Sequence, residues 1–346
     1  MKDKDSFCGF FGSELGDLLA QCSQPRYRLD QLAAWVYQKG VLDYKQMTNI
    51  GQKAVGQIEK ACSLSVLERV NIEESDDRET TKFLWKLNDG KFVESVLICS
   101  GKRRTVCVSS QVGCPARCAF CASGQFGLMR NLNAAEIVEQ VVHVHYFLRE
   151  KNCERVSNLV FMGMGEPLEN LDCVIRAIRI LTDPHLGGFS PRRITLSTVG
   201  IIEGINRLIE EKIGVNLALS LHASNQKIRE KIIPYARQAP LQALLAAVRR
   251  YAKETRRDMT YEYVLLAGIN DRVEDAEELG RLLKKDQCCV NLIPYNPVPK
   301  RKLKRPRKED IETFRNTLSR MGVRNTCRYT KGKDIAAACG QLAVTQ

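Results

Sequence analysis

The feature that most restricts the fold is an alternation of short apolar segments with longer amphipathic ones beyond residue 100. The short segments have strand character, and the segments between them have helical periodicity. Six strand–helix units predict an α/β fold with a parallel sheet, curled into either a doubly wound sheet or a barrel; we favour an open six-unit barrel. In both arrangements the active site lies at the C-terminal strand ends. The strands are expected at 105–109, 158–162, 193–197, 215–221, 260–266 and 290–294.

The clearest helix between these strands is expected at 134–149. Asn133 is a candidate N-cap, and Glu136 lies three residues later, which is the spacing of a capping box. The apolar face comprises Ile137, Val141, Val144 and Leu148. This pattern predicts an amphipathic helix packed on the sheet.

The first part of the chain has a different pattern. Residues 14–72 have the periodicity of short helices and little strand character. A polar stretch at 73–81 then precedes strand-like segments at 82–87 and 92–98. We therefore expect a helical domain at 1–72, a linker with a strand extension at 73–99, and a catalytic core at 100–346.

The composition is that of a globular protein. Of the 346 residues 44% are hydrophobic and 27% charged, and no apolar run approaches the roughly 18 residues that span a bilayer. The N-terminal segment carries acidic groups and lacks a long apolar core, so we expect no secretory signal and a cytoplasmic location. In that reducing compartment 14 cysteines indicate metal ligation, redox catalysis or packing rather than a disulfide framework.

The formal charge of +13 favours a polyanionic partner, and nucleic acid is the obvious one. A basic but inert surface is the alternative. Residues 300–308 (KRKLKRPRK) form a basic segment. It is interpreted either as a loop that contacts phosphates or as a solvated connection.

Three cysteines follow the first expected barrel strand in one short loop. Cys114, Cys118 and Cys121 have the spacing C-x3-C-x2-C. A structural zinc site normally has four protein ligands, whereas three thiolates on a [4Fe–4S] cluster leave one iron open. An open iron can chelate the amino and carboxylate groups of S-adenosylmethionine and pass an electron into its sulfonium, releasing a 5′-deoxyadenosyl radical. Packing cysteines or part of a zinc site are the alternatives.

This loop, with the aromatic Phe120 before the third cysteine, resembles the signature of the radical S-adenosylmethionine superfamily. Gly165 and Glu166, in GMGEP after the second strand, resemble the superfamily's motif that receives the amino group of the cofactor. Later strand ends carry polar groups that can bind its ribose, carboxylate and adenine, although each alone also suits a cap or turn. They are the side chains of Ser197, Ser220, His222 and Asn296, together with the backbone of Leu221 between Ser220 and His222.

The resemblance becomes closer over nearly the whole chain. SSQVGCPARCAFCASG, FMGMGEPLEN, SPRRITLSTVG, LALSLHA and AACGQLA are similar to RlmN, a family of ribosomal RNA adenine carbon-2 methyltransferases. PRYRLDQLAAWVYQKGVLDYKQMTNI is similar to that family's helical RNA-binding domain. The resemblance implies a [4Fe–4S] cluster, S-adenosylmethionine, and an electron donor such as flavodoxin or ferredoxin. It also implies a monomer acting on 23S ribosomal RNA at the peptidyl transferase centre, and on transfer RNA beside the anticodon.

The same resemblance implies three catalytic residues. Adenine carbon-2 is electrophilic, so a radical route is needed. Cys339 matches the cysteine that one S-adenosylmethionine methylates and whose methyl group then loses hydrogen to a radical made from a second. Cys107 matches the thiol that resolves the covalent RNA adduct by forming a disulfide with Cys339. Glu94 matches the acceptor of the carbon-2 proton.

Three other functions fit parts of the pattern. Cfr-type resistance enzymes modify carbon-8 with the same two cysteines, but Pro167 with Leu168 and the N-terminal segment favour carbon-2. An RNA-binding or ribosome-assembly factor with a structural or redox-sensing cluster, and an activase that installs a glycyl radical, are the others. We assign the remaining cysteines to packing or exposed thiols: Cys8, Cys22, Cys62, Cys99, Cys153, Cys173, Cys288, Cys289 and Cys327.

Overall fold

A computed structural model describes residues 5–299, 301–328 and 331–343. Its main sheet has ten strands in the order β1-β2-β3-β4-β7-β8-β9-β10-β11-β12. The first four are antiparallel to one another, and the strands from β4 to β12 are parallel. The strand bounds are β1 (Glu68–Glu74), β2 (Thr80–Lys86), β3 (Phe92–Ser100), β4 (Arg103–Cys107), β7 (Asn158–Phe161), β8 (Ile194–Thr198), β9 (Asn216–Ser220), β10 (Met259–Leu265), β11 (Cys288–Pro294) and β12 (Asn325–Cys327).

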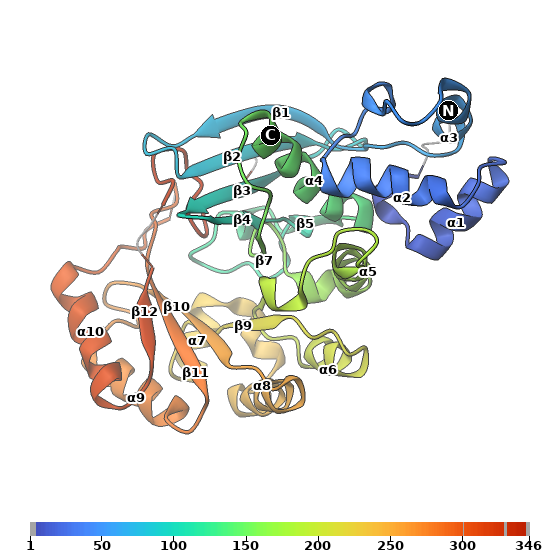
Figure 1. Cartoon of the computed structure of the whole chain (residues 1–346). Coiled ribbons are helices and arrows are strands. Elements are labelled where there is room, and N and C mark those ends of the chain that lie inside the picture. Colours follow the sequence, from blue (N-terminus) through green and yellow to red (C-terminus); the bar gives the residue numbers. More distant parts are fainter. Residues whose placement is uncertain (1–4, 300, 329–330, 344–346) are drawn as a thin grey trace.

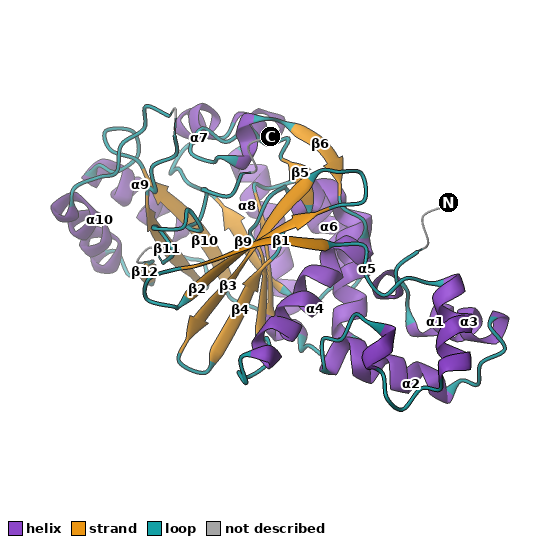
Figure 2. Ribbon diagram, turned by 90° about the horizontal axis from the view of Figure 1, so that it is seen from above, coloured by secondary structure: helices purple, strands orange, loops and turns teal. Residues whose placement is uncertain are grey.

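The strands fan out into a curved, open sheet with helices on its outer side (Figures 1 and 2). All six expected barrel strands are present, each within about two residues of its predicted bounds, so the open α/β barrel is confirmed. The covering helices are α4 (Ala134–Glu150), α5 (Leu171–Thr182), α6 (Ile202–Glu210), α7 (Gln226–Ile232), α8 (Leu241–Thr255), α9 (Val273–Leu283) and α10 (Lys308–Arg320).

Helix α4 begins as predicted. The Asn133 side chain accepts from the Glu136 N–H at 2.9 Å, and the Glu136 carboxylate accepts from the Asn133 N–H at 2.9 Å. The predicted apolar face is buried, as are Glu139 and Gln140 beside it.

The N-terminal region is helical only as far as Ala61. Its elements are η1 (Phe7–Gly9), α1 (Gly12–Gln21), α2 (Tyr27–Ala33), η2 (Ala34–Gln38), η3 (Tyr44–Gln46) and α3 (Gln52–Ala61). The expected boundary after residue 72 falls inside β1, and the expectation of little strand character over 14–72 is wrong for its last residues. Strand β1 lies at the sheet edge with mostly exposed residues, so it lacks the apolar alternation that identifies a half-buried strand.

Glu139 on α4 ties the N-terminal region to the barrel. Its carboxylate is fully buried and accepts hydrogen bonds from the Ser6 and Ser65 hydroxyls at 2.5 and 2.8 Å. It also accepts from the N–H groups of Val66 and Leu67 at 2.8 and 3.0 Å. Burial raises the pKa of Glu139 to about 7. Segments distant in sequence are thus joined on one side chain.

Two further short strands, β5 (Gln111–Gly113) and β6 (Leu128–Asn131), form a separate hairpin around the cysteine loop. Among the described residues, no helix is both long enough and apolar enough to cross a membrane.

Candidate active site

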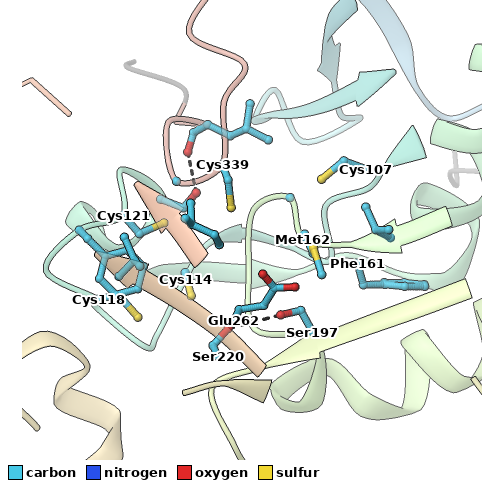
Figure 3. A pocket seen from close by; sticks show the side chains of 18 of the residues that line it. Cys107, Cys114, Cys118, Cys121, Phe161, Met162, Ser197, Ser220, Glu262 and Cys339 are labelled. Carbon is cyan, nitrogen blue, oxygen red and sulfur yellow. Dashed lines mark hydrogen bonds between the residues drawn. The ribbon is translucent and has the colours of Figure 1, made fainter. Parts of the chain in front are cut away.

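A pocket that is partly open to solvent lies at the C-terminal ends of the barrel strands. Figure 3 shows the predicted cysteines around it, contributed by distant parts of the chain. Of the site residues predicted from sequence, those that line the pocket are Cys107, Cys114, Cys118, Cys121, Gly165, Glu166, Ser197, Ser220, His222, Asn296 and Cys339. Glu94 and Leu221 do not line it.

The cysteine loop folds back on itself and on α7. The Cys121 N–H donates to the Cys118 carbonyl at 3.2 Å, and the Ala119 N–H donates to the Ile232 carbonyl at 2.8 Å. Cys114 and Cys118 are buried, and burial raises the pKa of Cys114 to about 12. A nearby cation is therefore needed to hold these groups as thiolates.

The three cysteines supply sulfur donors from one loop, and a [4Fe–4S] cluster accepts such a donor set. Within the described ranges, no three Cys, His, Asp or Glu side chains converge closely enough to hold one metal ion. In a [4Fe–4S] cluster each cysteine binds a different iron, so the sulfur atoms stand farther apart than around zinc. Three thiols of one loop that line one pocket are donors of this kind.

The GMGEP segment packs closely against the connection that follows β4. Gly165 has φ +110°, and a Cβ there would lie 2.7 Å from both the Gln111 Cβ and the Ser110 Oγ, so only glycine fits. The Glu166 carboxylate is buried, and it accepts from the N–H groups of Val199 at 2.8 Å and Leu168 at 3.1 Å. Burial raises its pKa to about 7. The Thr198 side chain also donates to this carboxylate, so the motif has a structural role.

The next strand ends supply the polar wall of the pocket. The Ser197 and Ser220 hydroxyls lie 3.3 Å apart. His222 has φ +56° and accepts from the Val264 N–H through Nδ1 at 3.0 Å, and burial lowers its pKa to about 3. Its neutral ring packs edge-on against Phe120 of the cysteine loop, with the ring centroids 4.7 Å apart. Leu221 is fully buried in the apolar core.

The C-terminal segment lies over the cysteine loop and presents Cys339 to the pocket. The Asn296 side chain donates to the Cys339 carbonyl at 3.1 Å. The Ala122 N–H donates to the Gly340 carbonyl at 2.7 Å, and the Ser123 hydroxyl donates to the Leu342 carbonyl at 2.6 Å. Three hydrogen bonds therefore fix the position of Cys339.

Cys107 and Cys339 face the same pocket (Figure 3). Cys107 is buried at the end of β4, where burial, and next the charge of Cys339, raise its pKa to about 12. Cys339 is reached by solvent through the pocket, yet the surrounding protein raises its pKa to about 11. Both groups are therefore neutral thiols near pH 7 in the absence of a base or a cofactor.

Glu94 lies just outside the pocket wall. It is on β3 and points to the same side as Val96 and Ile98, which do line the pocket. Its side chain is buried 3.6 Å from the Lys82 ammonium and accepts from the Ala343 N–H. Desolvation raises its pKa, so its affinity for a proton is increased.

Comparison with known proteins identifies both parts of the chain. Residues 108–283 match the family model of the radical SAM superfamily, and residues 7–64 match that of the ribosomal RNA large subunit methyltransferase N-terminal domain. The crystal structure of a radical SAM methyltransferase from Sphaerobacter thermophilus superposes with a TM-score of 0.95 at 43% identity, covering 98% of this chain and 99% of that one.

Two curated relatives are named as RNA methyltransferases. A probable dual-specificity RNA methyltransferase RlmN 2 from Protochlamydia amoebophila is 54% identical, with 98% of this chain and 95% of the relative covered. A probable dual-specificity RNA methyltransferase RlmN from Thermus thermophilus is 44% identical, with 92% and 89% covered. The chain belongs to the RlmN family.

Two pocket residues of this RlmN-family chain escaped the sequence reasoning. Glu262 on β10 is 3% exposed, and Asn291 donates to its Oε1 at 3.0 Å. Arg328 follows β12, and its guanidinium lies 3.9 Å from Glu262 Oε1. Glu262 stands in the otherwise apolar run MTYEYVL, and a lone acidic residue in a central parallel strand is a signal that could have identified it.

Glu262 also tests whether the pocket suits its implied cofactor. Its Oε2 is buried and has no hydrogen-bond partner among the described residues. An unpartnered buried carboxylate oxygen requires a donor. S-adenosylmethionine is cationic and carries ribose hydroxyls, so the residues present fit it.

Proposed function

We propose that this protein methylates carbon-2 of adenosine in 23S ribosomal RNA, and of the purine beside the anticodon in transfer RNA, with Cys339 as the methyl carrier. The observation that carries the proposal is that Cys339, Cys107 and the three loop cysteines all line one pocket. Neither the cysteine loop nor the C-terminal segment could perform the reaction alone.

In this proposal Cys114, Cys118 and Cys121 hold a [4Fe–4S] cluster, and S-adenosylmethionine lies against Gly165, Ser197, Ser220 and Glu262. When bound, these groups supply a methyl group and a 5′-deoxyadenosyl radical. Glu166 and His222 fix the surrounding loops through the hydrogen bonds and ring contact already described.

Three residues of the chain then act in turn. Cys339 Sγ accepts the methyl group and gives up its thiol proton. After the 5′-deoxyadenosyl radical has taken a hydrogen atom from this methyl group, its carbon adds to adenine carbon-2, and the adduct radical would lose one electron, for which the oxidised cluster is an acceptor. Glu94 accepts the proton from carbon-2, for which its raised pKa is suited. Cys107, as its thiolate, attacks Cys339 Sγ and a disulfide forms. The bond from sulfur to the new methyl carbon breaks, its electron pair passes to the base, and this carbon takes up a proton to become the methyl group.

RNA binding is supported by the basic segment beside the pocket. Lys302 and Lys304 are exposed, while Leu303 between them packs against the apolar cluster that contains Cys114 and Cys118. The segment is therefore anchored next to the pocket with its lysines in solvent, an arrangement that suits phosphate contacts. Lys300 lies outside the described residues.

The deciding experiment is mass spectrometry of nucleosides from RNA treated with the reconstituted enzyme, S-adenosylmethionine and dithionite. We expect 2-methyladenosine from the wild type and none from Cys339→Ala. An 8-methyladenosine product would instead identify a Cfr-type activity. RNA binding with no 5′-deoxyadenosine released would support an assembly factor with a structural cluster, and persistent 2-methyladenosine in Cys339→Ala would refute the carrier role.

A further inference from the structure

A buried cation lies on the helix that packs against the cysteine loop. Arg229 on α7 is 1% exposed, so its guanidinium is removed from water. Moving a charge from water into a protein interior is unfavourable unless an opposite charge compensates it. Fully buried arginines are therefore normally paired with an anion. Arg229 departs from this rule.

The hydrogen-bond partners of Arg229 carry no charge. Its Nη2 donates to the Val199 carbonyl and, at 3.5 Å, to the Ser220 carbonyl. Its Nε is buried and has no hydrogen-bond partner within the described residues. No carboxylate in the described part of the chain forms an ion pair with it. The guanidinium therefore joins α7 to the ends of β8 and β9, while no acidic side chain compensates its charge.

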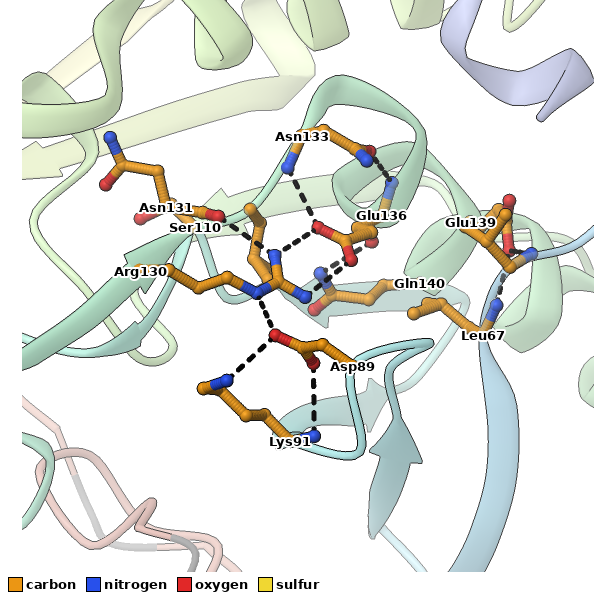
Figure 4. A network of polar contacts seen from close by, with 12 residues as sticks. Leu67, Asp89, Lys91, Ser110, Arg130, Asn131, Asn133, Glu136, Glu139 and Gln140 are labelled. Carbon is orange, nitrogen blue, oxygen red and sulfur yellow. Dashed lines mark hydrogen bonds and ion pairs between the residues drawn. The ribbon is translucent and has the colours of Figure 1, made fainter. Parts of the chain in front are cut away.

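Arg130 on β6 shows the usual arrangement in the same protein (Figure 4). Its guanidinium pairs with Asp89 at 2.6 Å and with Glu136 at 2.8 Å. The Arg130 side chain is 28% exposed, so water also stabilises its charge. Of these two arginines, the more deeply buried one is the one without a carboxylate. Arg229 therefore requires an anion from another source.

Helix α7 holds Arg229 against the cysteine loop. The Ala119 N–H donates to the Ile232 carbonyl at 2.8 Å, and Ile232 belongs to the same apolar cluster as Cys118. Arg229 stands three residues before Ile232, and residues at this spacing lie on the same side of a helix. The side of α7 that carries Arg229 thus faces the loop that carries Cys118.

Negative charge gathers around Cys118, and Arg229 opposes it. Burial raises the pKa of Cys118 well above its usual range, the charges of Cys121, Cys114 and Glu166 raise it further, and Arg229 lowers it. In turn, burial lowers the pKa of Arg229 to about 10, and the charge of Cys118 counteracts this shift. The guanidinium is therefore protonated near pH 7. Three thiolates in this loop would supply the anion that it lacks.

Arg229 acts from behind the pocket wall. It does not line the pocket, whereas Val199 and Ser220, to whose carbonyls it donates, do line it. A molecule in the pocket therefore meets these two residues and not the guanidinium. This position disfavours a direct contact with the carboxylate of S-adenosylmethionine and favours an electrostatic effect on the loop cysteines.

We propose that Arg229 is the counter-charge of the cluster and raises its reduction potential. This inference rests on the proposed function, in which the three loop cysteines hold a [4Fe–4S] cluster. Reduction adds one negative charge to a site that is already anionic, and a fixed cation in a medium of low dielectric constant favours the more negative state. The cluster gains one electron, the reductant loses it, and no bond is made or broken. Arg229 is thus a positioning residue that acts through Cys118 without touching substrate.

The test uses the full-length protein after anaerobic reconstitution, with variants compared at equal iron content. Arg229→Gln and Arg229→Met remove the charge, and Arg229→Lys keeps it. Arg229→Met is included because an apolar side chain of similar size is commonly tolerated in place of a buried charge. The reduction potential is measured by titration with dithionite and redox mediators, followed by electron paramagnetic resonance. The Kd for S-adenosylmethionine is measured by calorimetry.

Arg257→Gln is the matched control. The Arg257 guanidinium donates to Asn216 Oδ1 at 3.1 Å and to the Gly214 carbonyl at 2.5 Å, and its Nε is likewise buried without a partner among the described residues. It precedes β10, so it lies at the opposite ends of the strands from the pocket. Its replacement removes a cation and similar hydrogen bonds without affecting charge at the cysteines.

We expect the equilibrium constant for reduction to fall at least about tenfold in Arg229→Gln and Arg229→Met, which lowers the potential by about 59 mV or more. Arg229→Lys should stay within about threefold of the wild type because it keeps the charge. Arg257→Gln should have the wild-type potential, and the Kd for S-adenosylmethionine should change little in every variant. An unchanged potential in the two neutral variants would overturn the proposal.

Two other outcomes would also overturn it. An equal fall in Arg229→Lys and Arg229→Gln would mean that Arg229 acts only through its hydrogen bonds. A large rise in the Kd for S-adenosylmethionine with an unchanged potential would make Arg229 a cofactor ligand. Formation of 2-methyladenosine by the wild type reports separately on the proposed function: if the potential depends on Arg229 but no RNA is methylated, the proposed function fails and this inference stands.

Discussion

At the residue scale, the sulfurs of Cys107 and Cys339 differ in their surroundings. Cys107 is buried at a strand end, whereas Cys339 sits on a C-terminal segment held by three hydrogen bonds and is reached through the pocket. The pKa of each thiol is raised, to about 12 and about 11, so neither reacts spontaneously as a thiolate at neutral pH. This difference in access agrees with a methyl carrier that meets RNA and a second thiol that acts afterwards.

Replacing Cys107 with alanine should stop the reaction after RNA has become attached. Without the second thiol nothing attacks Cys339 Sγ, so the bond from sulfur to the new methyl carbon persists. We expect a protein–RNA adduct that survives denaturing electrophoresis, and release of methylated RNA reduced by at least about a hundredfold. Cys99→Ala, on neighbouring β3, is the control and should release product normally. Normal product release by Cys107→Ala would contradict the assignment.

Glu262→Gln should weaken binding of S-adenosylmethionine. The buried Oε2 has no hydrogen-bond partner within the described residues, and the amide replaces one carboxylate oxygen by a donor. Loss of a charge-assisted hydrogen bond costs about 1.5–3 kcal/mol, so we expect a Kd higher by roughly 10- to 100-fold in calorimetric titration. The iron content should stay unchanged. An unaltered Kd would mean that Glu262 faces the RNA base rather than the cofactor.

At the element scale, the site depends on how neighbouring elements are joined. Helix α4 begins with a capping box whose Glu136 also binds Arg130 of β6, and one turn later Glu139 binds the N-terminal region. One helix therefore connects the hairpin around the cysteine loop with the N-terminal helices. Its polar residues are buried because they serve as internal partners for backbone and side-chain donors.

Stability should decrease with rising pH because of Glu139. Its pKa in the folded protein is about 7, above the unfolded value of about 4.3, so the folded state binds this proton more tightly. The resulting contribution to the free energy of unfolding is complete below about pH 4.3 and is lost as pH rises through about 7. In Glu139→Gln, urea unfolding should show a flatter pH dependence over this window. The exposed Asp17→Asn variant should retain the wild-type profile, and an unchanged profile in Glu139→Gln would refute the argument.

At the scale of the whole molecule, charge and topology act together. The open sheet leaves a pocket at the strand ends, with the anchored basic segment on its border. A net charge of +13 provides long-range attraction for RNA without specifying a base.

The salt dependence of RNA binding tests this role of the basic segment. Replacing Lys302 and Lys304 with glutamine should lower the slope of log K against log salt by roughly one unit per lysine, with weaker binding of every RNA sequence tested. Lys284→Gln, at the end of α9, should leave the slope unchanged. Equal slopes for the Lys302/Lys304 variant and the wild type would mean that this segment is a solvated connection that does not contact phosphates.

Most of the fold could be read from the sequence because its parallel strands are buried and apolar, and its helices alternate with them. Four strands could not be predicted from the sequence. Edge strand β1 is mostly exposed, and β5, β6 and β12 have too few residues to show an alternation of apolar and polar positions. The cysteine spacing, the GMGEP motif and the capping box are local patterns, so the sequence alone predicted the candidate cluster loop, the superfamily and the start of α4.

Only the tertiary structure decided which distant groups meet. Cys107 and Cys339 are 232 residues apart, and nothing in their local sequence brings them to one pocket; the hydrogen bonds from Asn296, Ala122 and Ser123 do so. Glu262 likewise is important because it is buried and because its Oε2 has no hydrogen-bond donor among the described residues. Spacing can reveal a ligand set held by one loop, whereas a site assembled across a sheet depends on packing that short-range patterns do not record.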